Sequence, residues 1–275
     1  MVTLTAFADE ISADLQEQLD VLESEGIHHL ELRGVWNKNV LDLSDEEVQK
    51  VRDIVQSRGF KVSAVGSPIG KIDILDPMEP HVQRFKRALQ VAKVLETSYI
   101  RIFSFFIPQG QSPQSHRREV LARMAVLQEM AAGWEVVLLH ENEKEIYGDN
   151  AQRCLDILEH RLNENLACAF DPANFVQCGV KPYEEAFPLL QPYIRYVHIK
   201  DALFAGGTVV PAGQGDGALR AVLSRLFAQG YDGFLSLEPH LAHSDRYQGF
   251  SGPALFHVAA EALKNLLGEL GQVWQ

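Results

Sequence analysis

The chain has 275 residues, of which 46% are hydrophobic and 23% charged, so it can bury the core of one large or two small globular domains. Its net charge of −12 argues against a nucleic-acid partner, because phosphate backbones require clustered Lys and Arg. No apolar run is long enough to span a bilayer, and the N-terminus lacks the basic segment of a secretory signal. Three cysteines without paired spacing indicate buried thiols. We expect a cytoplasmic protein without a membrane partner.

Eight apolar, strand-like runs follow one another along the chain, and each precedes a segment with helical periodicity. The expected strands are residues 2–8, 26–32, 60–66, 99–105, 135–139, 166–170, 194–199 and 233–237. The expected helices are residues 14–25, 44–59, 80–95, 115–132, 150–162, 182–190, 218–229 and 253–270. Ser44 begins a capping box with Glu47, and Asp216 is a candidate N-cap for the helix at 218–229.

Such regular alternation predicts parallel βαβ units, and eight units predict a single (β/α)₈ TIM barrel over residues 1–275. A doubly wound open sheet is the alternative. That fold would typically carry a glycine-rich phosphate loop after its first strand, whereas the sequence there is Phe7-Ala-Asp-Glu10. We therefore expect one barrel, with its active site at the C-terminal ends of the strands.

Four successive strands end in acids or imidazoles. The run Val136-Val-Leu-Leu leads into His140 and Glu141, and the later strand ends carry Asp171, His198 and Glu238. Buried acids are costly unless something binds them, and these four side chains can converge on one ion. Three carboxylates and one imidazole predict a single divalent metal (Mn²⁺, Mg²⁺, Co²⁺ or Zn²⁺) rather than a structural zinc held by cysteines.

Further polar residues at the strand ends are candidates for substrate binding: Glu31, Arg33, Ser67, Lys71, Arg101, Asn174 and His240. Glu31 and Arg33 share one strand face, so they contact substrate or pair with each other. Lys200 follows His198 by two residues and points the same way, either as a catalytic group or as an ion-pair partner. His140 is offset by one from Glu141 and is expected to face outward as support, whereas Glu143 is expected at the rim of the site.

The chain resembles the xylose isomerase-like barrels over essentially its whole length. This family includes sugar isomerases and epimerases, inosose dehydratases and the endonuclease IV group. The resemblance is carried by Leu139-His-Glu-Asn-Glu143, Phe170-Asp-Pro-Ala-Asn174, His198-Ile-Lys-Asp201, Ser236-Leu-Glu-Pro-His240 and Gly213-Gln-Gly-Asp-Gly217. It implies that Glu141, Asp171, His198 and Glu238 bind one divalent metal.

Departures from the family patterns narrow what the resemblance implies. The extra histidines that hold three zinc ions in the endonuclease IV group are absent, which argues against DNA repair. Asn174 and Phe204 replace a histidine and an arginine of the ketose 3-epimerases, which argues against a free-ketose 3-epimerase. The segment from His198 to Asp201 is closer to the inosose-metabolising and uncharacterised sugar phosphate isomerase/epimerase branches.

The resemblance implies a metal-dependent isomerase or epimerase of a sugar or sugar phosphate that abstracts a proton next to a carbonyl, through an enediolate. Glu141 and Glu238 are the expected acid–base pair. One alternative is an inosose-type dehydratase, a lyase in which Lys200 or His240 serves as general acid. Another is a barrel that retains the metal and binds sugars without catalysis. The expected partner is a small sugar or cyclitol, with or without phosphate. By resemblance alone we expect a dimer or tetramer.

Two loops are expected to close the site. Residues 205–217 are long and glycine-rich, which suits a mobile lid or an ordinary connection in which Asp216 caps the next helix. Residues 240–252 end in Ser251 and Gly252 before a helix, an arrangement that can bind phosphate.

Overall fold

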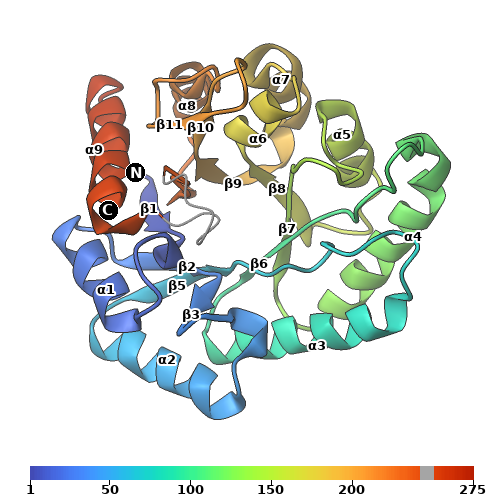
Figure 1. The fold of residues 1–275 in the computed structure, drawn as a ribbon, viewed down its shortest axis with the longest axis horizontal. Helices are drawn as coiled ribbons and strands as arrows, with labels where there is room; N and C mark the ends of the chain where they lie inside the picture. The colour runs from blue at the N-terminus through green and yellow to red at the C-terminus, as the bar shows by residue number, and fades with distance from the viewer. Residues whose placement is uncertain (242–250) are drawn as a thin grey trace.

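A computed structural model describes residues 1–241 and 251–275 and shows the expected (β/α)₈ barrel (Figure 1). Parallel strands form a nearly closed sheet in the order β1-β12-β9-β8-β7-β6-β5-β2. A parallel bridge between Phe7 and Glu31 brings the two ends of that order together. The strands are β1 (Thr3–Ala6), β2 (His29–Leu32), β5 (Lys61–Val65), β6 (Tyr99–Ile102), β7 (Val137–Glu141), β8 (Leu166–Phe170), β9 (Ile194–Ile199) and β12 (Phe234–Leu237).

Helices surround the barrel as an outer ring, and the last of them packs beside the first (Figure 1). They are α1 (Leu15–Ser24), α2 (Asp45–Ser57), α3 (Met78–Val94), α4 (Pro113–Ala131), α5 (Ala151–Glu159), α7 (Phe187–Leu190), α8 (Leu219–Ala228) and α9 (Gly252–Glu269). The capping box of Ser44 and Glu47 is present at the start of α2. A further helix, α6 (Pro172–Gln177), was not expected from periodicity. Of the helices in the described ranges, none is long and apolar enough to cross a membrane.

Shorter elements complete the chain. Single turns lie at η1 (Ala8–Glu10), η2 (Val40–Asp42), η3 (Pro182–Ala186) and η4 (Gln191–Tyr193). Two small antiparallel hairpins pair β3 (Gly34–Val35) with β4 (Lys38–Asn39) and β10 (Asp201–Ala202) with β11 (Val209–Val210). The expected helix at 182–190 is therefore a π turn, η3, that continues into the short α7.

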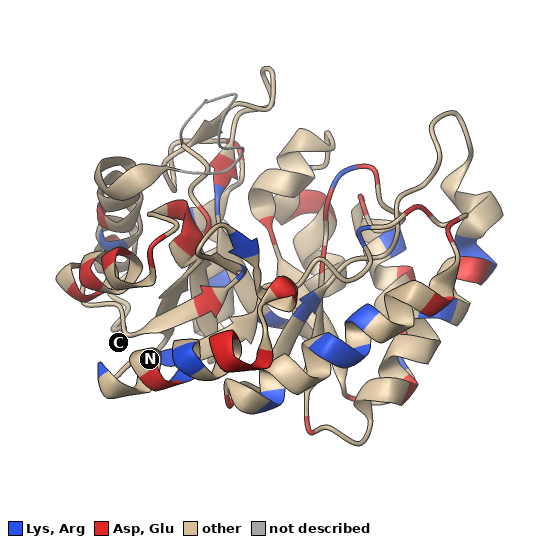
Figure 2. Ribbon diagram, turned by 60° about the horizontal axis from the view of Figure 1, so that its bottom comes forward, with Lys and Arg blue, Asp and Glu red and all other residues tan. Residues whose placement is uncertain are grey.

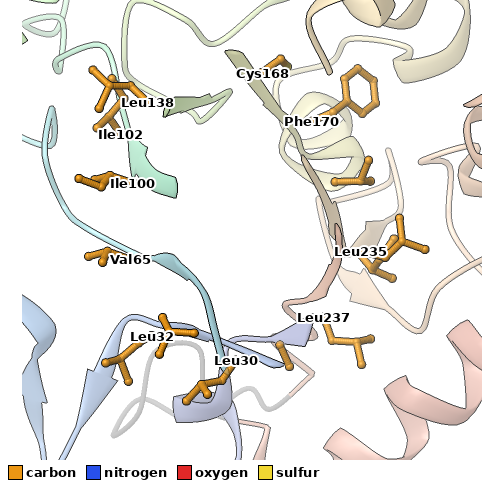
Figure 3. Packing of buried hydrophobic residues seen from close by; sticks show 14 of the residues in the cluster. Leu30, Leu32, Val65, Ile100, Ile102, Leu138, Cys168, Phe170, Leu235 and Leu237 are labelled. Carbon is orange, nitrogen blue, oxygen red and sulfur yellow. The ribbon is translucent and has the colours of Figure 1, made fainter. Parts of the chain in front are cut away.

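The main hydrophobic core lies between the strands and the helix ring. Figure 3 shows its strand side chains, among them Leu30, Ile100, Ile102, Leu138, Phe170, Leu235 and Leu237. Because successive side chains of a strand point to opposite faces, the residues between these leucines and isoleucines point into the barrel. The inner cluster is small and consists of Ala64, Leu139, Ala167, Ala169 and Tyr196. The same alternation directs Glu31, Arg101 and Glu141 inward.

The connection after β9 differs from expectation at Asp216. This residue does not cap α8, whose N-cap is Ala218 with φ of 51°. Its carboxylate accepts instead the backbone N–H of Phe204 at 2.7 Å. The neighbouring Asp201 organises the loop: its two carboxylate oxygens accept N–H groups from Ala202, Gly213, Gly215 and Gly217 at 2.8–3.0 Å. The predicted cap was wrong because tertiary contacts to β10 determine where this chain segment turns.

Candidate metal centre

The four strand-end residues predicted to bind a metal lie together inside the barrel. Glu141 ends β7, Asp171 follows β8, His198 lies near the end of β9, and Glu238 follows β12. Each offers one ligand atom, and these atoms all lie within 4.8 Å of one another. All four side chains are buried. Figure 2 shows charged residues within the barrel as well as over the outer helices. The barrel therefore brings three acids and one imidazole to one point.

The imidazole Nδ1 of His198 faces all three carboxylates. It lies 3.1 Å from Glu141 Oε1, 3.9 Å from Glu238 Oε2 and 4.0 Å from Asp171 Oδ2. This nitrogen has no hydrogen-bond partner among the described residues. Buried polar atoms without partners are rare and need an explanation, such as an ion. The donor set, three carboxylate oxygens and one nitrogen, fits one divalent cation.

Each carboxylate of the cluster has its second oxygen held by a donor outside the cluster. The bonds are Arg101 Nη1 to Glu141 Oε2 at 2.6 Å, Arg33 Nη1 to Glu238 Oε1 at 2.9 Å, and Asn174 N to Asp171 Oδ1 at 2.8 Å. The side-chain amide of Asn174 also donates a hydrogen bond to Glu141 Oε1, at 3.1 Å. Partners of this kind orient metal ligands, so one oxygen of each acid turns toward His198.

The other ring nitrogen of His198, Nε2, faces Glu31. Oε2 of Glu31 lies 3.3 Å from His198 Nε2 and accepts a hydrogen bond from Ser236 Oγ at 2.8 Å. The ring of Phe7 meets the imidazole edge to face, with centroids 5.2 Å apart. Glu31 is fully buried, so it contacts the imidazole from within the barrel. A carboxylate in this place orients the ring and supports Nδ1 as the ligand nitrogen.

Lys200 lies against the same cluster. Its Nζ is 2.8 Å from Asp171 Oδ2 and 3.0 Å from Glu238 Oε2. Burial alone would lower the pKa of Lys200, but these two carboxylates hold it well above the usual range. Burial raises the pKa of Asp171 to about 6. Burial also acts to raise the pKa of Glu238, but Lys200 and His240 hold it well below its usual range.

The cluster opens on a cavity of about 200 Å³. Its wall includes most of the residues expected to contact substrate or perform catalysis: Arg33, Lys71, Arg101, Glu141, Asn174, Lys200, Glu238 and His240. Glu143, expected at the rim, also lines the cavity, and its carboxylate lies 3.1 Å from Lys71 Nζ. Most of the residues predicted from the sequence to contact substrate or perform catalysis therefore share one cavity.

Two expected substrate-binding residues do not line this cavity. Glu31 is not paired with Arg33, whose guanidinium binds Asp9, Glu10 and Glu238 instead. Ser67 is fully buried and donates its hydroxyl hydrogen to the carbonyl oxygen of Arg101 at 2.5 Å. Both residues lie behind the groups that face the cavity. Strand alternation predicts on which face of the sheet a side chain lies, but it does not predict how deep in the barrel that side chain lies.

Three lining residues were missed: Lys144, Gln177 and Val209. Gln177 is carried by α6, and Asp171 followed by Pro172 was a readable signal for that helix, since an N-cap acid and a first-turn proline mark a helix start. Val209 lies in the hairpin after β9, whose position depends on Asp201. No local pattern could have placed it at the cavity.

The expected phosphate loop lies partly outside the described residues, since residues 248–250 are among those not described. In its described part, the Ser251 hydroxyl lies 3.1 Å from Glu10 Oε2 and accepts the Leu241 N–H at 3.0 Å. The His240 N–H also donates to Glu10 Oε2 at 3.3 Å, and His240 Nε2 lies 3.0 Å from Glu238 Oε1.

Comparison with known proteins places the chain in a family. The family described as xylose isomerase-like TIM barrel matches residues 19–266, and the chain belongs to it. A curated relative, 3-dehydroshikimate dehydratase of Bacillus anthracis, is 20% identical over 176 residues. That match covers 64% of this chain and 62% of the relative, so the similarity spans less than two thirds of the relative's length.

Solved structures share the fold over nearly the whole chain. A D-tagatose 3-epimerase-like protein superimposes with a TM-score of 0.78 at 16% identity, covering 98% of both chains. The IOLI protein, solved with a zinc atom bound, superimposes with a TM-score of 0.77 at 18% identity, covering 98% of this chain and 99% of that one. At these identities the likeness establishes the fold.

Proposed function

We propose that this xylose isomerase-like barrel is a divalent-metal-dependent isomerase or epimerase of a small keto sugar or keto cyclitol. The observation that carries the proposal is the position of Glu141 and Glu238. Both line the cavity, they arise from strands separated by β8 and β9, and each turns one oxygen toward the same point as His198 Nδ1. Two carboxylates placed in this way can reach a substrate from two sides.

A divalent ion bound by Glu141, Asp171, His198 and Glu238 would polarise the carbonyl of the substrate. The residues of the chain supply the proton transfer. One of the two glutamates removes the proton on the carbon next to the carbonyl, and the other, which enters the step protonated, delivers its proton to the opposite face or to the neighbouring carbon. Return to the opposite face is epimerisation, whereas return to the neighbouring carbon is isomerisation. Arg101 and Arg33 keep the two carboxylates in place.

A dehydratase is the second candidate, favoured by the curated relative and by two acid groups in the wall. After the same proton abstraction, the hydroxyl on the β-carbon leaves as water with a proton from Lys200 or His240. Lys200 Nζ and His240 Nε2 both lie 3.0 Å from a Glu238 oxygen and both line the cavity. Either group can therefore donate near the site of proton removal.

The test is incubation with Mn²⁺ in D₂O and a panel of keto sugars, keto cyclitols, dehydroshikimate-type keto acids and the available phosphate esters. Deuterium incorporation into carbon without loss of water indicates isomerisation or epimerisation. Loss of water indicates dehydration. If no panel member exchanges deuterium or loses water, the catalytic proposal fails for these substrates and a sugar-binding role is favoured.

The metal site has a separate test. We expect Glu141→Gln and His198→Ala to lose most of the bound metal in elemental analysis, because each removes a ligand from a buried cluster. Glu143→Gln is the matched control, since Glu143 lines the cavity but does not belong to the cluster. Full metal content in both ligand variants would show that the assigned site is wrong.

A further inference from the structure

Lys200 and a metal ion would need the same oxygen atoms. The Lys200 ammonium donates a hydrogen bond to Glu238 Oε2 at 3.0 Å and lies 2.8 Å from Asp171 Oδ2. These are two of the three carboxylate oxygens that face His198 Nδ1, at 3.9 and 4.0 Å. The ammonium therefore lies against the oxygens that would coordinate an ion.

The other cations of the site are arranged differently. Arg101 and Arg33 bind the outer oxygens of Glu141 and Glu238, so both can stay in place when an ion binds. Among the described residues, Lys200 is the single Lys or Arg within ion-pair distance of a cluster-facing oxygen. Its side chain is 7% exposed, so it is not a solvated surface lysine that could leave without cost.

We infer that Lys200 is an exchangeable cation of the metal centre: its ammonium competes with the divalent ion for Asp171 and Glu238. The inference rests on the metal site described above. Ion binding breaks both contacts of the ammonium, and the released Nζ turns to the cavity that it already lines. There it can donate to an oxygen of the substrate. Metal affinity is thus set partly by a lysine that is not a ligand, and loading exposes the lysine to substrate.

The experiment titrates Mn²⁺ into chelator-treated protein by isothermal calorimetry, with Lys200→Met compared with the wild type. Removing the competing ammonium should tighten Mn²⁺ binding by about tenfold or more, because two charge-assisted contacts no longer have to break. Lys71→Met is the matched control. Lys71 lines the same cavity, but its ion-pair partner is Glu143, outside the cluster. It should change the affinity by less than about threefold, as a screened charge does.

Each outcome decides the inference. Tighter binding in Lys200→Met but not in Lys71→Met supports it. Equal or weaker binding in Lys200→Met, with a wild type that binds Mn²⁺, overturns the competition and leaves the metal site intact. If neither protein binds Mn²⁺, the metal site itself is wrong and the inference falls with it. Should Lys200→Met not fold without an ion, Lys200→Gln and removal of Mn²⁺ from loaded protein by a competing chelator give the same comparison.

Thermal unfolding supplies a second readout that does not involve activity. In chelator, Lys200→Met should melt roughly 5 °C or more below the wild type, because the buried Asp171 loses its nearest cation. Saturating Mn²⁺ should then raise the melting temperature of the variant more than that of the wild type. Equal shifts in the two proteins would contradict the exchange.

Discussion

Asp201 is the residue on which the loop after β9 depends, and Asp201→Asn tests that role. The aspartate is fully buried, and its two oxygens accept four backbone N–H groups. Added Cβ atoms at Gly215 and Gly217 would lie 2.4 and 2.6 Å from Asp201 Oδ1, so the loop can approach the carboxylate only with glycine there. Asparagine has nearly the same shape, and the substitution therefore changes hydrogen bonding rather than packing.

The expected loss of unfolding free energy in Asp201→Asn follows from these four hydrogen bonds. Oδ1 accepts from Ala202 and Gly217, and Oδ2 from Gly213 and Gly215. An asparagine keeps one oxygen and turns its amide hydrogens toward two N–H donors. Hydrogen bonds to a charged acceptor contribute about 1.5–3 kcal/mol each, and the Gly213 and Gly215 amides are partly open to water, which lowers their loss. We expect a cost of about 3 kcal/mol.

Urea unfolding followed by circular dichroism measures this cost. In thermal unfolding it corresponds to a decrease of roughly 6–12 °C for a chain of this size. Asp216→Asn is the control, because Asp216 accepts a single N–H, from Phe204, in an exposed position. It should cost less than about 1 kcal/mol. Equal stability of the two variants would refute the assigned role of Asp201.

Two further predictions concern titrating groups outside the cavity. Burial alone would raise the pKa of Glu25, but hydrogen bonds from Lys264 and His257 lower it below 4.5. The contribution of Glu25 to the free energy of unfolding is therefore fully present above about pH 4.5 and is lost as the pH falls further. Glu25→Gln should cost about 1–2 kcal/mol in urea at pH 7 and less at pH 3, and equal costs at both would contradict the ion pair. Burial lowers the pKa of His81 from 6.5 to about 4, which leaves Nε2 free to accept the Gly70 N–H at 2.8 Å. The contribution of this hydrogen bond to the free energy of unfolding is present above pH 6.5 and is lost as the pH falls through 4. An NMR titration midpoint near pH 6.5 for the His81 ring would show that the interpretation is wrong.

Much of the fold could be predicted from the sequence, because the patterns that specify it are local. Each apolar run forms a strand wherever the next segment can form a covering helix, and eight such repeats leave few alternatives to a barrel. The four residues of the candidate metal centre could be predicted for the same reason. Glu141, Asp171, His198 and Glu238 each sit at the end of a buried strand, where an acid or imidazole needs a partner.

The depth of a side chain within the barrel could not be predicted from the sequence. Glu31 and Arg101 both point inward one residue before the ends of their strands, β2 and β6, but of the two Arg101 lines the cavity and Glu31 does not. The register between β2 and β5 shifts beside Glu31, and its carboxylate meets His198 from within the barrel. A one-residue difference along a strand changes the height of a side chain by about 3.3 Å. Register is a property of neighbouring strands, which periodicity in one strand does not specify.

The sequence by itself determined the barrel, the end at which its site lies and the four residues that converge there, because alternation and strand ends are short-range features. Tertiary structure decided which oxygen of Glu141 and of Glu238 faces the centre, through Arg101 from β6 and Arg33 from the chain after β2. It also decided that Lys200 shares two of those oxygens and that Asp201 brings Val209 to the cavity. These contacts join residues far apart in the chain, so they depend on how the whole ring of strands closes.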